Sequence, residues 1–184
     1  MIHDMIAHYS IDICAITETW LSGDHRDHHT LADLKNTLPN FQFYHIPRMN
    51  RAGGGVLVYL RKGFHVRRHE VLVYDAFEHI DLSINSSSNE PLRLMVVYRL
   101  LNKKHTATLF MQEFSSLLEH IAHDANHMIA GDFNFHIDNR SDREALTFCE
   151  LLESTGLKQH VSGPYTGSSF NKVFGLFYLP LDHM

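Results

Sequence analysis

Short apolar runs separated by polar segments recur along the first hundred residues of the chain. They are rich in β-branched and aromatic residues, which favour strands. The segments between the later runs are short, as expected for antiparallel neighbours in a sheet. The runs that predict strands are Ile13–Ile16, Phe41–Ile46, Val56–Leu60, Val71–Tyr74, His79–Ile84 and Leu92–Tyr98.

The second half of the chain has a different periodicity. Apolar residues recur at helical spacing over Thr106–His123 and again over Arg143–Ser154, where Gly156 follows at the position of a C-cap glycine. Between these two segments, Met128–Ala130 predicts a short buried strand. Many strands with a few helices predict an α+β sandwich in which helices cover packed sheets.

Composition limits the class of protein. The chain has 184 residues, 44% of them hydrophobic and 20% charged, which suits one domain with a packed core. No apolar run reaches the roughly 18 residues of a membrane span, and residues 1–4 do not begin a signal peptide. We therefore expect an intracellular protein, nuclear or cytoplasmic and not secreted, with Cys14 and Cys149 as buried free thiols. Nothing in the pattern indicates an oligomeric state.

The formal net charge of −5 argues mildly against a dedicated nucleic-acid binder. Basic residues nevertheless occur in pairs, and a patchy surface can hold phosphate while the total charge stays acidic. A zinc site at His25, His28 and His29 is the weaker alternative to solvated loop histidines, because no Cys or His pair follows at ligand spacing. The basic pairs are Arg48 and Arg51, Arg61 and Lys62, Arg67 and Arg68, and Lys103 and Lys104.

Three apolar strands end in polar groups that are suited to chemistry. Glu18 follows the first predicted strand, Tyr98 ends the sixth, and Asp132 and Asn134 follow the short strand between the helices. A rigid core positions strand ends well, so side chains there can be aimed accurately. A carboxylate, a phenol and a carboxylate–carboxamide pair thus become the candidate site.

The motifs around these residues resemble one family. Over residues 4–166 the sequence is similar to the endonuclease/exonuclease/phosphatase superfamily, which is deoxyribonuclease I-like. The similarity is greatest to the reverse-transcriptase-associated endonuclease domains of LINE-type non-LTR retrotransposons. The resemblance implies a four-layer α/β sandwich, two packed mainly antiparallel sheets flanked by helices. The motifs are Glu18–Leu21, Gly53–Val56, Val97–Arg99, Gly131–Asn134 and Gln159–Val161 with Gly163–Pro164.

The resemblance also implies roles for the strand-end residues. Glu18 would bind Mg²⁺, with Mn²⁺ as an alternative, because carboxylate oxygen is a ligand that Mg²⁺ prefers. Asp132 would orient or deprotonate the attacking water, and Asn134 would donate its amide to the phosphate or hold Asp132. Tyr98 would place its hydroxyl on the scissile phosphate. The partner would be the phosphate backbone of DNA, nicked to leave a 3′-hydroxyl for reverse transcription.

Each of these residues also has a purely structural interpretation. Glu18 would then be an exposed strand-end carboxylate, Asp132 and Asn134 an Asx turn, and Tyr98 a half-buried strand aromatic. His136 and Asp138 are interpreted as loop residues. The glycine run at 53–55 is not interpreted as a nucleotide cradle, because no helix follows it. We interpret it as a segment that lets a strand edge pass close to its neighbour. Arg51 would contact the DNA backbone or be solvated.

The sequence departs from the family at both ends. No Asn can be assigned ahead of the first helix, and after Thr166 the pattern is lost, so we expect a partial domain at 1–166 and a divergent, poorly packed tail at 167–184. Asp182 and His183 are either a relic of the family's Asp-His motif or a frayed terminus. We therefore expect an incomplete fold and very weak nicking. Open alternatives are abasic DNA, RNA or a phosphoinositide as substrate, and an inert remnant or interaction domain of the same fold.

Overall fold

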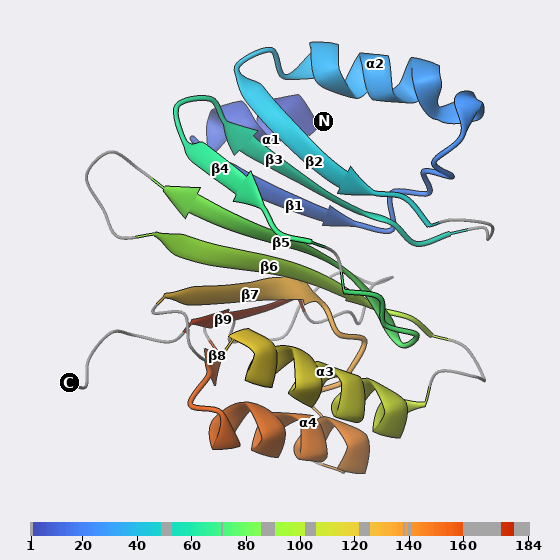
Figure 1. Cartoon of the computed structure of the whole chain (residues 1–184), viewed down its shortest axis with the longest axis vertical. Helices are drawn as coiled ribbons and strands as arrows, with labels where there is room; N and C mark the ends of the chain where they lie inside the picture. The colour runs from blue at the N-terminus through green and yellow to red at the C-terminus, as the bar shows by residue number, and fades with distance from the viewer. Residues whose placement is uncertain are drawn as a thin grey trace.

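The computed structural model describes residues 2–48, 53–70, 72–85, 91–101, 106–121, 126–137, 139, 141–159 and 174–178, with the backbone alone for 2, 3 and 174–178. Two sheets pack face to face and helices cover their outer faces (Figure 1). The elements are α1 (Ile2–His8), β1 (Ile13–Thr17), the short 3₁₀ turn η1 (His25–Asp27), α2 (His28–Thr37), β2 (Phe41–Ile46), β3 (Val56–Arg61), β4 (His65–Arg68), β5 (Phe77–Asn85), β6 (Leu92–Arg99), α3 (Ala107–Ile121), β7 (His127–Asp132), α4 (Arg143–Ser154), β8 (Lys158–Gln159) and β9 (Phe174–Tyr178). The predicted α+β sandwich of two sheets flanked by helices is confirmed.

The smaller sheet has the strand order β1-β3-β2, and both pairings are antiparallel. The larger sheet has the order β4-β5-β6-β7-β9-β8, with β6 and β7 as its parallel pair. The helix α3 makes the crossover that a parallel pair requires. Because β6 and β7 run in the same direction, Tyr98 and Asp132 come to the same edge, and they are register partners.

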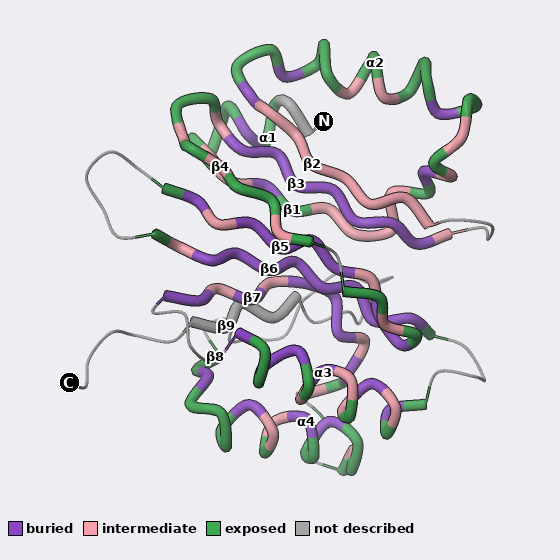
Figure 2. Tube along the Cα trace, viewed as in Figure 1, coloured by how far each residue is buried: buried purple, intermediate pink, exposed green. Residues whose placement is uncertain are grey.

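Alternation along the strands separates three cores. Even-numbered residues of β3, β5 and β6 face the other sheet and form the core between the sheets, with Val58, Ile80 and Val96 fully buried. Odd-numbered residues of β5 and β6 face α3 and α4, where Phe110, Phe114 and Phe148 pack. The third core lies between the smaller sheet and helices α1 and α2. Buried positions accordingly run along the central strands, and the outer helices are exposed on their far sides (Figure 2).

The predicted helices and most predicted strands are confirmed. Helix α4 has the predicted bounds, its N-cap Asp142 accepts hydrogen bonds from the backbone N–H groups of Glu144 and Ala145, and Gly156 follows with a φ of +75°. Helix α3 begins one residue later than predicted and ends, within the described residues, at Ile121. The interpretation of Ser86–Ser88 as a hairpin loop falls outside the described residues.

One predicted strand is wrong, and the two edge strands of the larger sheet, β4 and β8, were missed. Residues 72–74 of the predicted strand Val71–Tyr74 form no strand, and Val73 is 91% exposed, so this apolar run was not a sign of burial. The edge strand β4 pairs with β5 instead, although its sequence is largely polar. An edge strand needs hydrogen bonds on one side only and tolerates polar side chains, which is why its pattern carried no signal.

Residues 167–184 were predicted to be a divergent tail. Five of them form β9, which lies between β7 and β8 and pairs antiparallel with Met128–Asp132. The other residues of this segment, including Asp182 and His183, lie outside the described part of the chain. The tail therefore stays a prediction for those residues, while the backbone of Phe174–Tyr178 belongs to the larger sheet.

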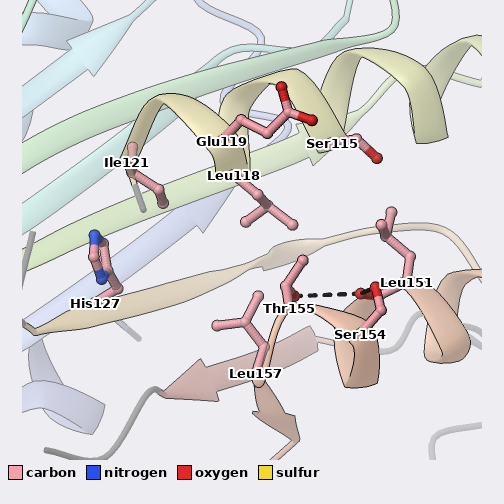
Figure 3. Close-up of a pocket in the computed structure, with 9 residues that line it drawn as sticks. All are labelled: Ser115, Leu118, Glu119, Ile121, His127, Leu151, Ser154, Thr155 and Leu157. Atoms are coloured by element: carbon pink, nitrogen blue, oxygen red, sulfur yellow. Dashed lines mark hydrogen bonds between the residues drawn. The ribbon is translucent and has the colours of Figure 1, made fainter. Parts of the chain in front are cut away.

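A pocket of about 360 Å³ opens between the C-terminal parts of α3 and α4, beside the start of β7 (Figure 3). His127, Glu119 and Leu157 line it. His127 is the first residue of β7 and Asp132 the last, so at about 3.3 Å per residue the pocket lies some 17 Å from the strand-end residues. Among the helices that the structure describes, none is long and apolar enough to cross a membrane.

Candidate active site

The turn that follows β1 positions Glu18. Glu18 and Trp20 have φ values of +56° and +59°, in the left-handed region that non-glycine residues rarely adopt. Two backbone hydrogen bonds hold this turn against the glycine run: Thr19 N–H donates to the Gly55 carbonyl at 3.3 Å, and Trp20 N–H to the Gly54 carbonyl at 2.9 Å. The strained turn is therefore fastened to the strand beside it, and the Glu18 side chain leaves from a fixed backbone.

The glycine run is required by this close approach. Gly54 and Gly55 have φ values of +77° and +87°, and a side chain at Gly55 would collide with the Thr19 side chain. A side chain at Gly54 would meet Arg48 and Glu78. The sequence interpretation, glycines that let a strand edge pass close to its neighbour, is confirmed.

Tyr98 lies near the end of β6 and joins the two sheets. Its hydroxyl donates a hydrogen bond to Glu18 Oε1 at 2.8 Å, and the side chain is buried. Burial raises the pKa of the Tyr98 phenol well above its usual value, and the hydrogen bond and charge of Glu18 and the charge of Asp132 raise it further, against the opposing effect of Arg48. Tyr98 is therefore a protonated phenol at neutral pH, able to donate to an anionic oxygen and unsuited to act as a base.

Asp132 ends β7 beside Tyr98. Its side chain is buried, and Oδ1 accepts a hydrogen bond from the backbone N–H of Asn134 at 3.1 Å. Asn134 has a φ of +52°, and its amide Nδ2 donates to the Arg99 carbonyl at 3.0 Å. The Asx turn that the sequence offered as a structural alternative is thus formed, and the Asn134 side chain binds backbone. Gly131 precedes Asp132 because a side chain there would collide with the Val97 carbonyl on β6.

Two residues that the sequence did not single out as a pair support this edge. The Glu78 carboxylate accepts a hydrogen bond from Gly55 N–H at 2.6 Å with Oε2, and from Arg48 Nε at 2.6 Å with Oε1. Glu78 is the register partner of Tyr98, and the Arg48 guanidinium lies 6.0 Å from the centre of the Tyr98 ring. The sequence placed Arg48 in a basic pair on a surface able to hold phosphate, but its side chain is only 18% exposed and forms an ion pair with Glu78.

Arg99 connects the two strand-end motifs. One of its amino groups, Nη1, donates to the carbonyls of Phe133 at 3.4 Å and Asn134 at 3.1 Å. The guanidinium carbon lies 3.9 Å from the centre of the Phe135 ring, and burial lowers the Arg99 pKa. Arg99 thereby holds the loop that carries Asp132. The sequence contained it within the tyrosine motif but offered no sign of this contact, which depends on how β6 and the loop after β7 pack.

The other candidates do not join this group of residues. His136 is exposed in the loop after the Asx turn, as predicted for a loop residue. His25 lies in η1, and His28 and His29 lie in α2. Asp138 and Arg51 fall outside the described residues. Cys14 and Cys149 are free, as predicted, but only Cys14 is buried and Cys149 is half-buried; burial raises the pKa of both thiols.

Several solved structures have the same fold. An endonuclease/exonuclease/phosphatase family protein from Bacteroides thetaiotaomicron superposes with a TM-score of 0.64 at 13% identity, covering 97% of this chain and 73% of that one. ANGEL2, a 2′,3′-cyclic phosphatase in complex with adenosine-2′,3′-vanadate, has a TM-score of 0.65 at 14% identity, covering 97% and 73%. D. rerio TDP2 with a single-strand DNA product has a TM-score of 0.60 at 16% identity, covering 98% and 76%.

Identities this low show the fold alone. Comparison with curated proteins gives no match. The model of the Endonuclease/Exonuclease/phosphatase family, however, matches residues 1–184, the whole of the sequence. This chain belongs to the endonuclease/exonuclease/phosphatase family.

Proposed function

We propose that this protein is a Mg²⁺-dependent phosphodiesterase that nicks DNA in the manner of a retrotransposon endonuclease. The observation that carries the proposal is the 2.8 Å hydrogen bond from the Tyr98 hydroxyl to Glu18, made beside Asp132, the register partner of Tyr98. The bond joins the ends of β1 and β6, and Asp132 ends the strand β7 that is paired with β6. Hydrolysis of a phosphate ester needs a group that activates water and donors for the charge that develops on phosphorus.

The donor set suits a divalent cation, which the family generally uses. Glu18 and Asp132 offer carboxylate oxygens, hard ligands of the kind that Mg²⁺ and Mn²⁺ accept. Glu18 is the residue that would hold the ion. When bound, the ion would screen phosphate charge and stabilise the leaving 3′ oxygen.

The remaining steps fall to the chain's own residues. Asp132 would orient the attacking water and accept its proton, since its carboxylate is held in place by the Asn134 backbone. The Tyr98 hydroxyl would donate a hydrogen bond to a phosphate oxygen, in place of the bond that it makes to Glu18. Arg99 would keep the Asp132 loop in position through its bonds to the Phe133 and Asn134 carbonyls.

DNA is the proposed substrate for two reasons. The glycine run before β3 and the Tyr98-Arg99 pair resemble retrotransposon endonucleases in sequence, and the glycine run fixes the Glu18 turn. In addition, a protein of the same fold, D. rerio TDP2, has been solved with a single-strand DNA product. RNA, abasic DNA and a phosphoinositide are competing substrates for the same chemistry.

A second candidate is a catalytically inert interaction domain of the same fold. In favour of it, no cluster of three or more His, Cys, Asp and Glu side chains that could hold a metal occurs among the described residues. The Asn134 amide is also engaged with backbone, and donates to the Arg99 carbonyl.

Plasmid nicking separates the two candidates. The purified chain would be incubated with supercoiled DNA in Mg²⁺, in Mn²⁺ and in EDTA, beside Asp132→Asn and the matched control Asp33→Asn, which removes an exposed carboxylate from α2. We expect slow, metal-dependent nicking that falls by about 10²- to 10⁴-fold in Asp132→Asn and is kept in Asp33→Asn. Equal nicking by the wild type, Asp132→Asn and Asp33→Asn would favour the inert domain. Parallel reactions with RNA, abasic DNA and a phosphoinositide rank the substrates.

A further inference from the structure

Trp20 is the only tryptophan in the chain, and it is 67% exposed although it follows a strand of the core. The next residue, Leu21, is 4% exposed and packs with the core beneath α1 and α2. The turn after β1 therefore returns the chain to the interior while it leaves the largest aromatic side chain in solvent. A surface tryptophan at a candidate active site is a feature that core packing does not explain.

The backbone that carries this indole is constrained. Trp20 has a φ of +59°, an uncommon conformation for a bulky residue, and its N–H donates to the Gly54 carbonyl at 2.9 Å. The neighbouring Thr19 is fastened to Gly55 in the same way. The indole thus has a rigid base, so that little conformational freedom of the backbone would be lost when a ligand binds there.

The position of Trp20 places it beside the phosphate chemistry. Trp20 is two positions after Glu18, and their Cα atoms are at most about 7 Å apart, which is close to two nucleotide steps of about 3.4 Å along a helical strand. A Cβ atom added to Gly53 would lie 4.0 Å from both Trp20 Cζ2 and Arg48 Nη1. An aromatic ring and a cation therefore flank the same glycine at the edge of the site.

We propose that Trp20 is a nucleobase-stacking platform that holds the base of a nucleotide next to the scissile phosphate. The inference rests on the proposed function and narrows its substrate. An indole face stacks on any base, because every base has a π-face. A base inside a duplex is already stacked on both faces, so the platform selects unstacked nucleotides: a single strand, a frayed end or a distorted duplex.

Binding measurements without turnover test the platform. Fluorescein-labelled oligothymidylate would be titrated in EDTA by fluorescence anisotropy, beside an oligomer of equal length in which the bases are absent. Variants are Trp20→Ala, Trp20→Tyr, which keeps an aromatic face, and Tyr9→Ala, a control aromatic that is 70% exposed beside the C-terminal end of α1. Because Trp20 is the single tryptophan, quenching of the wild-type fluorescence reports contact at this residue alone.

We expect Trp20→Ala to weaken binding of oligothymidylate by about 5- to 100-fold and to leave binding of the base-free oligomer nearly unchanged. Trp20→Tyr should lie closer to the wild type than Trp20→Ala does, and Tyr9→Ala should match the wild type. Wild-type fluorescence should be quenched by oligothymidylate and less by the same sequence as a duplex. Oligouridylate and oligodeoxyuridylate, which differ only in the sugar, tell which sugar the platform accepts, and a loss of binding with either oligomer supports the platform.

The outcomes separate this inference from the proposed function. Unchanged binding in Trp20→Ala, or an equal loss with the base-free oligomer, overturns the platform even if the protein nicks DNA. A base-dependent loss in a protein that nicks nothing supports the platform as a binding site and overturns the proposed nuclease. A wild-type protein that binds neither oligomer overturns the platform, and the nicking assay then decides the proposed function by itself.

Discussion

The two ends of the central strand β6 both bury charged or polar side chains, but they treat the charge differently. At its start, Arg93 forms a buried bidentate pair with Asp81, with Arg93 Nη2 2.6 Å from Asp81 Oδ2 and Nε 3.0 Å from Oδ1. At its end, Tyr98 donates a neutral hydroxyl to Glu18, and Asp132 accepts a backbone N–H. Asp81 is bound directly by a cation, whereas the hydrogen bonds to Glu18 and Asp132 described here come from a phenol and a backbone amide.

The two ends of β6 differ in how well their carboxylates are suited to chemistry. An arginine-paired carboxylate inside the protein stabilises structure, because removal of either partner leaves an uncompensated charge. A carboxylate held by neutral donors keeps its charge for a cation, a water molecule or a proton. Strand β6 thus has a structural ion pair at its start and the candidate site at its end.

The largest expected effect comes from breaking the structural end. Asp81→Asn leaves Arg93 charged and buried, and we expect the free energy of unfolding to fall by about 3–5 kcal/mol. Urea denaturation followed by circular dichroism measures it. Asp24→Asn removes a carboxylate from the exposed Arg26 pair and should leave stability nearly unchanged. Equal effects of the two substitutions would contradict the assignment of Asp81 as structural.

Tyr98→Phe tests the other end. It removes the hydroxyl that meets Glu18 while it keeps the ring in the core between the sheets. Because a preorganised donor to phosphate oxygen is lost, we expect metal-dependent nicking to fall by about 10²- to 10³-fold. Tyr44→Phe, which removes a hydroxyl bonded to Gln42, is the matched control. Full nicking activity in Tyr98→Phe would show that the Tyr98 hydroxyl has no part in catalysis and that the ring serves only in packing.

His79 predicts how stability depends on pH. It is 3% exposed near the Asp81–Arg93 pair, and burial lowers its pKa to about 4. The unfolded chain therefore binds more protons between pH 4 and 6.5, so the stabilisation present above pH 6.5 is lost as pH falls through this window, by at most on the order of 3 kcal/mol. Urea midpoints from pH 7 to 4 for the wild type and His79→Gln measure it. An equally steep decline in His79→Gln would assign the dependence to other groups.

The smallest expected effect concerns Arg99. Arg99→Lys keeps a positive charge but loses the planar group that bonds two carbonyls and stacks on Phe135. We expect the Asp132 loop to shift and nicking to fall by about 10- to 100-fold. Glu144→Gln, which removes the charge of an exposed carboxylate 3.8 Å from Arg99, should have almost no effect. A wild-type nicking rate in Arg99→Lys would show that the loop carrying Asp132 keeps its position without the Arg99 guanidinium.

Local pattern determined much of the fold. The continuous apolar runs of β3 and β6 and the helical spacing of α3 and α4 report burial directly, because each side chain's face follows from the period of its own element. The glycine run and the strand-end positions of Glu18 and Asp132 were visible for the same reason. The pattern predicted the wrong secondary structure where it does not follow burial, as at the exposed Val73 and in the polar edge strand β4.

The contacts between the candidate site residues depend on the tertiary structure. The Tyr98–Glu18 bond spans 80 positions in sequence, and the Glu78 contact with Arg48 spans 30. Both depend on how two sheets stack and on the register of β5 with β6, which arise from packing over the whole core. Arg99 looks like any arginine after a strand until the loop beyond β7 folds over it. The sequence determines which chemical groups are present and which face of its element each one is on. The distances between groups from different sheets are set by the way the sheets pack.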